Sequence, residues 1–433
     1  MHEHYERSKI DSATPLDPSP EQKPPIDRKQ YNRIIWVLGS LCAIGPFSID
    51  MYLPGFPAMA ADLATDIAHV GLSLTSYFVG IAIGQIAYGP LMDRFGRKKP
   101  LMLGLWVFIA AALGCAFARS ISTLIVLRFF LALGGCVGMA GSRTVVRDLF
   151  SGIEVARVLS ALVMVFGVSP IIAPTIGGLV VKGFGWRFIF IILAAIGAAV
   201  LVALVRLLKE SRGADTSISL HPKSIILDYM GLFREPAFVV YTFAGAAAVA
   251  GFFAYISGSS LVYMELLGFS ETQFGWMYGI NAIGLIGGSQ INRLWLKRQD
   301  SAGILLRVSA AQFLIIVALL VLPLHGVLGR FGLMSLLFGY LFFYGFVNAN
   351  SMALALMPFT RNVGSASALM GSIQVVAGAL TSWLVSSLHD GTALPMIRVM
   401  AGCAVISVVM LWGFVLPRRF TLAHPRGGRG PGA

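Results

Sequence analysis

Charged residues are scarce in this chain of 433 residues, because Asp, Glu, Lys and Arg together make up only 12% of it. Soluble proteins carry about 25% charged residues, so this chain has too little polar side chain to cover a surface that faces water. Hydrophobic residues make up 57% of the chain and come in blocks of roughly 20, the length that an α-helix needs to cross a bilayer. The composition therefore excludes a soluble enzyme and predicts an all-α membrane protein.

Groupings of residues that would indicate catalysis or metal binding are missing as well. The four cysteines stand singly in apolar stretches, without a CxxC pair, and we interpret them as small packing residues. They are Cys42, Cys115, Cys136 and Cys403. The seven histidines are scattered, and no Ser-His-Asp order or phosphate loop stands out. We therefore expect no enzymatic activity, no metal and no cofactor.

The apolar blocks form two equal groups. The longest connection between them, 209–235, is polar and is predicted to be a cytoplasmic loop that separates six spans from six. We expect twelve transmembrane helices in two six-helix halves, 33–208 and 236–416, with a disordered tail at 1–32 and a second tail at 417–433. The predicted spans are at about 33–57, 70–91, 100–118, 122–145, 157–181, 187–208, 236–260, 272–294, 303–323, 331–352, 364–388 and 393–416.

Basic residues predict the orientation of the chain. The formal net charge of +13 would suggest a nucleic-acid partner for a soluble protein, but here Lys and Arg lie mainly in short loops. The loops after the even-numbered spans, with their flanks, hold Arg94, Arg97, Lys98, Lys99, Arg147, Lys209, Arg212, Lys223, Arg234, Lys297, Arg298 and Arg361. The loops after the odd-numbered spans hold Arg119, Lys182, Arg187 and Arg330. The basic side is cytoplasmic by the positive-inside rule, so both termini are predicted to be cytoplasmic.

A short segment recurs at about half the length of the chain. GPLMDRFGRKK at 89–99 aligns with GSQINRLWLKR at 288–298. The aligned pairs are Gly89 with Gly288, Asp93 with Asn292, Arg94 with Arg293 and Lys98 with Lys297. Two basic loops can match by chance, but the offset agrees with the six-plus-six division, so we interpret the match as the internal repeat of a two-half transporter.

Asp50 is the only acidic residue that the predicted spans place well inside the hydrocarbon. A charge at the centre of a membrane helix costs about 2.5–3.5 kcal/mol, so a functional role is the default interpretation. Removal from water disfavours the charged form of a carboxyl group, which makes reversible protonation possible near neutral pH. Pro46 and Pro54 weaken the helix on both sides of it. The alternative is that Asp50 lies near the outer interface and is simply solvated.

Arg128 is the predicted electrostatic partner of Asp50. It lies about 9 Å into the fourth span, at a depth similar to that of Asp50, and a buried arginine stays charged. We expect the two to be coupled, directly or through water. The alternative is that Arg128 caps helix carbonyls or extends towards the interface. Arg143 and Arg398 lie close to the predicted boundaries and are interpreted as interfacial anchors.

The loop after the second span is predicted to act as a conformational latch on the cytoplasmic side. Asp93 can pair with an arginine or cap a helix N-terminus, and the basic residues can face lipid phosphates. The alternative is an ordinary positively charged anchor. The predicted latch residues are Gly89, Asp93, Arg94, Gly96, Arg97, Lys98, Arg147 and Asp148.

Two further sets of residues inside the spans are candidates for a functional role. The fifth span carries two prolines and a glycine pair, which predict a bendable, closely packed helix at a moving interface. These are Pro170, Pro174, Gly177 and Gly178. Polar or aromatic residues in other spans could bind solute, although such residues also form hydrogen bonds between helices. They are Tyr77, Gln85, Tyr255, Asn281, Asn348 and Asn350.

The motifs together resemble a known family. GPLMDRFGRKKPL resembles the loop signature of the major facilitator superfamily, and LRFFLALGG, with Arg128, is similar to its fourth-helix arginine motif. APTIGG at 173–178 is similar to the fifth-helix signature of drug/proton antiporters, with Ala173 where glycine is usual. SIDMYLPGFP at 48–57 resembles the first-helix hallmark of the Bcr/CflA drug-resistance group, which includes bicyclomycin and chloramphenicol/florfenicol exporters.

The resemblance implies a proton-coupled exporter in a bacterial inner membrane, working by alternating access with helices 1, 4, 7 and 10 around a central cavity. It implies that Asp50 carries the proton and that Arg128 tunes it. A related multidrug antiporter has a second acidic residue where this chain has Cys42. With a single membrane carboxylate, we expect substrates to be small neutral or zwitterionic antibiotics or toxic compounds.

Other classes of function stay open at this stage. A proton-coupled transporter of a metabolite, such as an amino-acid derivative, would carry the same features. A membrane receptor or channel fits less well, because the internal repeat and the isolated carboxylate are typical of transporters. The expected partners are the small-molecule substrate, protons and the lipid bilayer, with no nucleic acid, and we expect a monomer.

Overall fold

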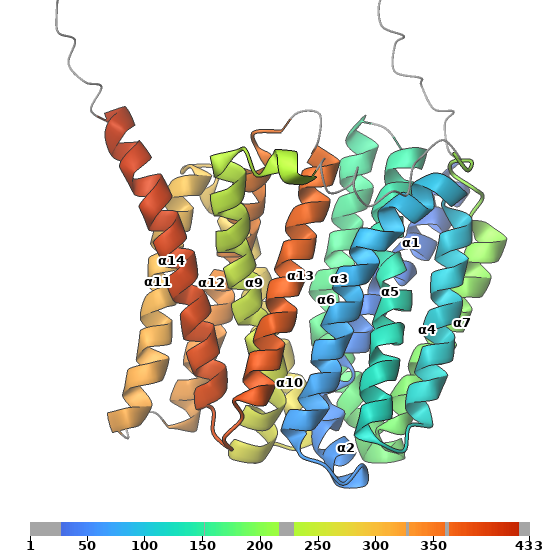
Figure 1. The fold of residues 1–433 in the computed structure, drawn as a ribbon, viewed down its shortest axis with the longest axis horizontal. Coiled ribbons are helices and arrows are strands. Elements are labelled where there is room, and N and C mark those ends of the chain that lie inside the picture. The colour runs from blue at the N-terminus through green and yellow to red at the C-terminus, as the bar shows by residue number, and fades with distance from the viewer. Residues whose placement is uncertain (1–26, 151, 216–228, 326–328, 360–362, 424–433) are drawn as a thin grey trace, which may run out of the picture.

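The computed structural model describes residues 27–150, 152–215, 229–325, 329–359 and 363–423, and every regular element in these ranges is helical. Long helices run roughly side by side through the molecule (Figure 1). They are α1 (Arg28–Asp50), α3 (Ile67–Phe95), α4 (Lys98–Ala116), α5 (Ile121–Leu149), α6 (Gly152–Phe184), α7 (Arg187–Leu207), α9 (Pro236–Ser260), α10 (Glu271–Trp295), α11 (Ser301–Val321), α12 (Arg330–Leu356), α13 (Val363–Ser387) and α14 (Leu394–Ala423). The short elements are η2 (Leu53–Gly55), α2 (Phe56–Asp62), η3 (Leu261–Leu266) and η4 (Leu322–His325).

The composition of these helices confirms the prediction of an all-α membrane protein. Ten spans in the described part of the chain are long and apolar enough to cross a bilayer. Of the other two predicted spans, α6 has a shorter apolar stretch at Val168–Phe184, and α10 is interrupted by polar residues such as Asn281. Large apolar side chains, including Leu103, Leu314 and Val409, are exposed on the outside of the bundle, as expected where lipid covers the surface.

The helices form two groups that follow the order of the chain. In the N-terminal half, α5 packs against α3, α4 and α1, and α7 packs against α4. In the C-terminal half, α9 packs against α12, α13 and α14, while α12 also packs against α10 and α11. The halves meet where α3 packs against α13 and α6 packs against α10. Figure 1 shows α13 beside α3 at the boundary between the two groups.

The observed helices extend beyond several of the predicted spans. α1 begins at Arg28, five residues before the expected start, so 28–32 are helical and the tail predicted at 1–32 is too long. α14 continues to Ala423, beyond the expected end at 416. Hydropathy identifies only the apolar part of a helix that lies in the hydrocarbon core, so it did not predict the polar ends of these helices. The rest of the predicted tails lies outside the described residues.

The first span is interrupted, and the interruption defines one end of the molecule. α1 ends at Asp50, and η2 and α2 follow, whereas Pro46 lies inside a continuous helix. Pro54 lies in η2 and cannot donate to the carbonyl of Asp50, which accounts for the break there. We call the end of the bundle that holds α2 the α2 end. The opposite end, where α1 begins and α7 and α14 finish, is called the basic end (Figure 1).

Candidate functional site

Asp50 is buried at the contact between the two halves. The residue is 4% exposed and is the last residue of α1. One of its carboxyl oxygens accepts a hydrogen bond of 3.1 Å from the hydroxyl of Tyr278, which belongs to α10 of the other half. The alternative position that the sequence left open, solvated at the outer interface, is therefore not the one observed.

Arg128 is buried nearby but does not contact Asp50 directly. Its guanidinium lies between the rings of Tyr52 and Tyr77, 4.2 and 4.3 Å from their centroids. Its Nη1 donates to the carbonyl of Ser48 at 2.9 Å. Since α1 ends at Asp50, the carbonyl of Ser48 in its last turn has no backbone N–H partner in the described ranges, and Arg128 satisfies it. The prediction was coupling to Asp50, directly or through water, with capping of helix carbonyls as the alternative. No direct ion pair is seen among the described residues, and Arg128 does cap a helix carbonyl.

Part of the Arg128 guanidinium has no protein partner. The residue is fully buried, and its Nε and Nη2 atoms make no hydrogen bond to the described part of the chain. These two atoms form the edge of a guanidinium that binds a carboxylate or phosphate through two parallel hydrogen bonds. A buried donor pair of this kind needs water or another acceptor to avoid a desolvation penalty. Coupling between Arg128 and Asp50 through water is compatible with this geometry.

A cluster of aromatic residues in the C-terminal half holds Tyr278 in place. Tyr278 stacks on Tyr255 with ring centroids 5.9 Å apart and an interplanar angle of 23°. The Nδ2 atom of Asn281 donates to the hydroxyls of Tyr255 and Tyr263, both at 2.8 Å. Tyr263 lies in the π-helical turn η3 that continues α9. This cluster orients the Tyr278 hydroxyl towards the N-terminal half.

A small cavity of about 40 Å³ adjoins this cluster. Its lining comprises Pro170, Phe252, Tyr255, Tyr278, Asn281, Ala282, Leu285, Ile286 and Leu341. Pockets that bind drug-sized ligands measure about 300–1,000 Å³, so this conformation has no room there for such a compound. The lining comes from α6, α9, α10 and α12, only two of which, α9 and α12, are among the four helices that the family resemblance implied.

Hydrogen bonds between the halves are found towards the α2 end. The hydroxyls of Thr75 in α3 and Ser382 in α13 lie 2.8 Å apart. Within the C-terminal half, Ser257 of α9 donates to the same Ser382 at 2.7 Å. Ser260 donates to the carbonyl of Leu53 in η2 at 3.1 Å. The Thr75–Ser382 and Ser260–Leu53 contacts join the halves at the end towards which Asp50 lies. They were not predicted, because single hydroxyl residues carry no signal in the sequence.

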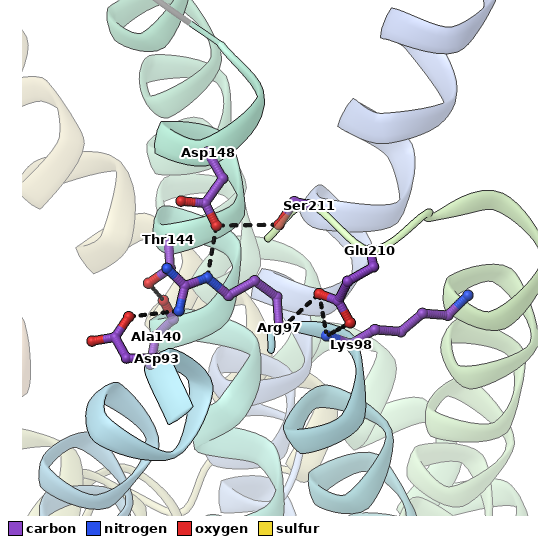
Figure 2. A network of polar contacts seen from close by, with 8 residues as sticks. All are labelled: Asp93, Arg97, Lys98, Ala140, Thr144, Asp148, Glu210 and Ser211. Atoms are coloured by element: carbon purple, nitrogen blue, oxygen red, sulfur yellow. Dashed lines mark hydrogen bonds and ion pairs between the residues drawn. The ribbon is translucent and has the colours of Figure 1, made fainter. Parts of the chain in front are cut away.

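The predicted latch is a network of ion pairs at the basic end (Figure 2). Arg97 is 3% exposed and donates to Asp93 at 2.6 Å and to Asp148 at 2.7 Å. Burial alone would lower the pKa of Arg97, but its hydrogen bonds to Asp148 and Asp93 outweigh this effect and raise the pKa above its ordinary value. The network lies within the N-terminal half, where it joins α5 to the turn between α3 and α4.

Two residues after α7 complete this network and were missed by the sequence analysis. Glu210 accepts hydrogen bonds from the backbone N–H of Arg97 at 2.7 Å and of Lys98 at 3.2 Å, and so caps α4. Ser211 donates to Asp148 at 3.2 Å. The turn at Gly96 has φ +83°, a conformation that favours glycine. The sequence shows an acidic residue, Glu210, directly after a predicted span. It does not show which helix that residue caps.

Three other predicted latch residues, Gly89, Arg94 and Arg147, are not among the residues that Figure 2 draws. The amine of Lys98 bonds the carbonyl of Val205 at 2.9 Å, which ties α4 to α7. A methyl group added to Gly89 would meet nothing within 4 Å. Arg94 lies over the ring of Phe95 at 5.9 Å, and Arg147 lies in the last turn of α5.

The proline and glycine residues of α6 bring it close to both neighbouring helices. A methyl group on Gly177 would collide with the carbonyl of Met51, and one on Gly178 would collide with the carbonyl of Glu271 at the start of α10. Gly275 of α10 in turn lies against the backbone of Pro174. The fifth-span motif is therefore a place where helices of the two halves pack backbone to backbone, as close-packed glycines allow.

The predicted solute-binding residues are dispersed. Tyr255 and Asn281 line the cavity, whereas Tyr77 is buried against Arg128 and donates to the carbonyl of Gly45 at 3.3 Å. Gln85 and Asn348 are partly buried. Asn350 donates to Asn292 at 2.7 Å. Asn292 is the residue that the repeat aligned with Asp93, so a neutral pair lies near the position where the N-terminal half has its ion pairs.

Comparisons with known proteins agree with this architecture. The sequence profile of the Major Facilitator Superfamily matches residues 38–382. An uncharacterized MFS-type transporter, YdgK, of Bacillus subtilis is 33% identical over 90% of this chain and 97% of its own length. A bicyclomycin resistance protein homolog of Haemophilus influenzae is 32% identical over 87% of this chain and 94% of its own length. The multidrug resistance protein MdtL of Escherichia coli is 28% identical over 89% of this chain and 96% of its own length.

Solved structures share the fold. A bacterial homolog of the human lysosomal transporter Spinster, in an inward-facing and unoccupied conformation, superposes with a TM-score of 0.70. It covers 94% of this chain and 100% of its own, at 13% identity. A mutant of the nucleoside transporter NupG gives a TM-score of 0.69 at 14% identity, covering 89% of this chain and 99% of its own. At these identities the likeness concerns the fold alone, and it confirms the expected architecture of two helical halves.

Proposed function

Because this chain belongs to the major facilitator superfamily, and is thus a membrane transporter and not an enzyme, we propose that it exports small toxic compounds in exchange for protons. The substrate class is that of neutral or zwitterionic antibiotics. Two observations support the export of drugs: relatives that match over most of their length are named for bicyclomycin resistance and multidrug resistance. No cofactor takes part in this proposal, since the proton gradient is the energy source.

The single observation that carries proton coupling is the burial of Asp50 between the halves. A carboxylate in such a place is costly while it is ionised and inexpensive once it is protonated. Movements that open and close the site to water therefore change its affinity for a proton. Binding of a proton in turn biases the equilibrium between the two conformations, because linkage is reciprocal. Arg128 stabilises the broken end of α1 that carries this carboxyl group.

The proposed orientation places the basic end in the cytoplasm and the α2 end outside, in a bacterial inner membrane. Its support is the excess of Lys and Arg in the loops at the basic end, where α1 begins and α14 ends. In this orientation the contacts near Asp50 close the outer side. The Arg97 network then lies on the cytoplasmic side, where we propose that it stabilises one of the two alternating conformations. The transporter acts as a monomer in this proposal.

The substitution Asp50→Asn tests the coupling. Asparagine has nearly the shape of aspartate but cannot exchange a proton, so export against a gradient should be lost while expression is retained. The first measurement is the susceptibility of an efflux-deficient bacterial host to bicyclomycin and a panel of other antibiotics. The second is the proton flux that a compound exported in the first assay causes in proteoliposomes containing the purified protein. Asp50→Asn should give no protection and no compound-dependent proton flux.

Asp66→Asn is the matched control, because Asp66 is an exposed N-cap of α3 at the same end of the molecule and asparagine also caps helices. This variant should transport like the wild type. Uphill export at the wild-type rate by Asp50→Asn would refute the role of Asp50 in coupling. If the wild-type protein protects the host against none of the compounds, the proposed substrate class is refuted.

A further inference from the structure

The hydroxyl of Tyr278 is the only described donor to Asp50, and it reaches Asp50 from the opposite half of the molecule. α1 carries the carboxyl group and α10 carries the hydroxyl, so the hydrogen bond exists only while the halves are together. Such a contact differs from the other hydrogen bonds between the halves, Thr75 with Ser382 and Ser260 with Leu53, because both partners of those are uncharged.

The protonation state of Asp50 changes the free energy of closing the halves in two opposing ways. An ionised carboxylate loses its hydration when the halves come together, which opposes closure. A hydrogen bond to an ionised group is worth roughly twice a neutral one, which favours closure. A protonated carboxyl group has neither a large hydration to lose nor a strong attraction for the hydroxyl. The balance for the ionised form therefore depends on the single donor.

From this geometry we infer that Tyr278 is a positioning residue of the coupling site, and that it allows Asp50 to stay ionised while the α2 end is closed. The inference rests on the proposed function and extends it to the C-terminal half. In an exchanger, this contact keeps the empty, ionised transporter closed until a substrate arrives. Without the hydroxyl, ionisation alone would open the α2 end and allow it to cycle without cargo.

The groups around Asp50 limit which residues can titrate with it. Tyr77 from α3, Arg128 from α5, Tyr255 from α9 and Tyr278 from α10 lie near the carboxyl group. Tyrosine and arginine keep one protonation state between about pH 5 and pH 8.5 in water. Cys42 lies two turns before Asp50 in α1 and is buried. Among the groups beside the carboxyl, a change within this pH range is therefore assigned to Asp50. His69 and His389 lie near Asp66 at the same end, but they are the same in parent and variant and cancel from a ratio taken at one pH.

Tyr278→Phe tests this inference, because it removes the hydroxyl and keeps the ring that stacks on Tyr255. Tyr340→Phe is the matched control: it removes the hydroxyl of another buried tyrosine of the C-terminal half, one that lies in α12 outside the Tyr255–Tyr263–Tyr278 cluster and does not line the cavity. All variants carry Ser260→Cys as a reporter, since Ser260 is fully buried between the halves and the four native cysteines are buried as well. The rate of labelling by a membrane-impermeant maleimide is measured on the purified, substrate-free protein.

We expect Tyr278→Phe to be labelled about tenfold faster than the parent at about pH 8, the effect of losing a hydrogen bond to a charged group. At about pH 5.5, where burial favours the protonated form of the Asp50 carboxyl group, the two rates should agree within about twofold. Taking each ratio at one pH cancels the intrinsic pH dependence of the thiol. Tyr340→Phe should follow the parent at both values. Adding Asp50→Asn should return Tyr278→Phe to the slow rate, because no charge is then left unpaired.

Equal labelling of Tyr278→Phe and the parent at both pH values would overturn the inference, and so would an increase of the same size at both. If Tyr278→Phe alone is not recovered as a folded protein, the pair with Asp50→Asn must restore folding, and failure to do so also overturns it. The labelling needs no transport, so it separates this inference from the proposed function. Suppose that Asp50→Asn loses coupled export but Tyr278→Phe is labelled at the same rate as the parent. That result would reject only the role of Tyr278, and the proposed proton exchange would stand.

Discussion

At the scale of single residues, Arg128 is the clearest case of a side chain whose chemistry fits its surroundings. Its planar guanidinium lies between two tyrosine rings and bonds a carbonyl at the end of α1. Arg128→Lys keeps the charge but loses the stacked plane, and a desolvated cation–π contact is worth about 2 kcal/mol. We expect this variant to unfold at a clearly lower temperature in detergent, measured by a thermal shift of the purified protein.

The same helix supplies a control for this substitution. Arg143 lies in α5 as well but is exposed, so Arg143→Lys should leave the unfolding temperature almost unchanged. Equal stability of the two variants would show that the stacking contributes nothing.

The sequence revealed Arg128 because a charge in an apolar run stands out by itself. It could not show the partner of Asp50, since Tyr278 is one of twelve tyrosines and lies 228 residues away.

At the scale of helices, hydropathy identified the spans, but it could not identify which residues cap them. Glu210 shows this limit, since it follows α7 and caps the N-terminus of α4, more than a hundred residues earlier in the chain. Local patterns describe one helix at a time, whereas a cap from another segment is a tertiary contact. The latch residues Asp93, Arg97 and Asp148 were predictable because most of them lie together in one charged motif.

The Glu210 cap makes a prediction for this element. Glu210→Ala leaves the N–H groups of Arg97 and Lys98 without their acceptor and removes a negative charge from a helix N-terminus, and each effect costs about 1 kcal/mol. Amide hydrogen exchange should become faster in the first turn of α4 while other helices keep their protection. Lys209→Ala, at the exposed neighbouring position, should leave amide exchange unchanged both in the first turn of α4 and in the other helices. Unaltered exchange in α4 after Glu210→Ala would mean that the cap is dispensable in solution.

At the scale of the whole molecule, the division into two halves was predictable and the relation between the halves was not. The polar connection at 209–235 and the offset of the repeat both follow from the sequence. The contact between halves depends on ordinary residues such as Thr75 and Ser382, which lie 307 positions apart. Which end of a transporter is closed is a small free-energy difference between two packings of one sequence, and no local pattern encodes it.

Thr75 and Ser382 also allow the movement of the halves to be tested. Their hydroxyls lie 2.8 Å apart across the boundary, within reach of a disulfide if both are replaced by cysteine. Oxidation of the Thr75→Cys/Ser382→Cys pair should fix the α2 end closed and abolish export, and a reductant should restore it. Either single cysteine should export equally well with and without oxidant, because the native cysteines are buried. Continued export by the fully cross-linked protein would contradict alternating access at this boundary, since a substrate could then leave without separation of α3 from α13.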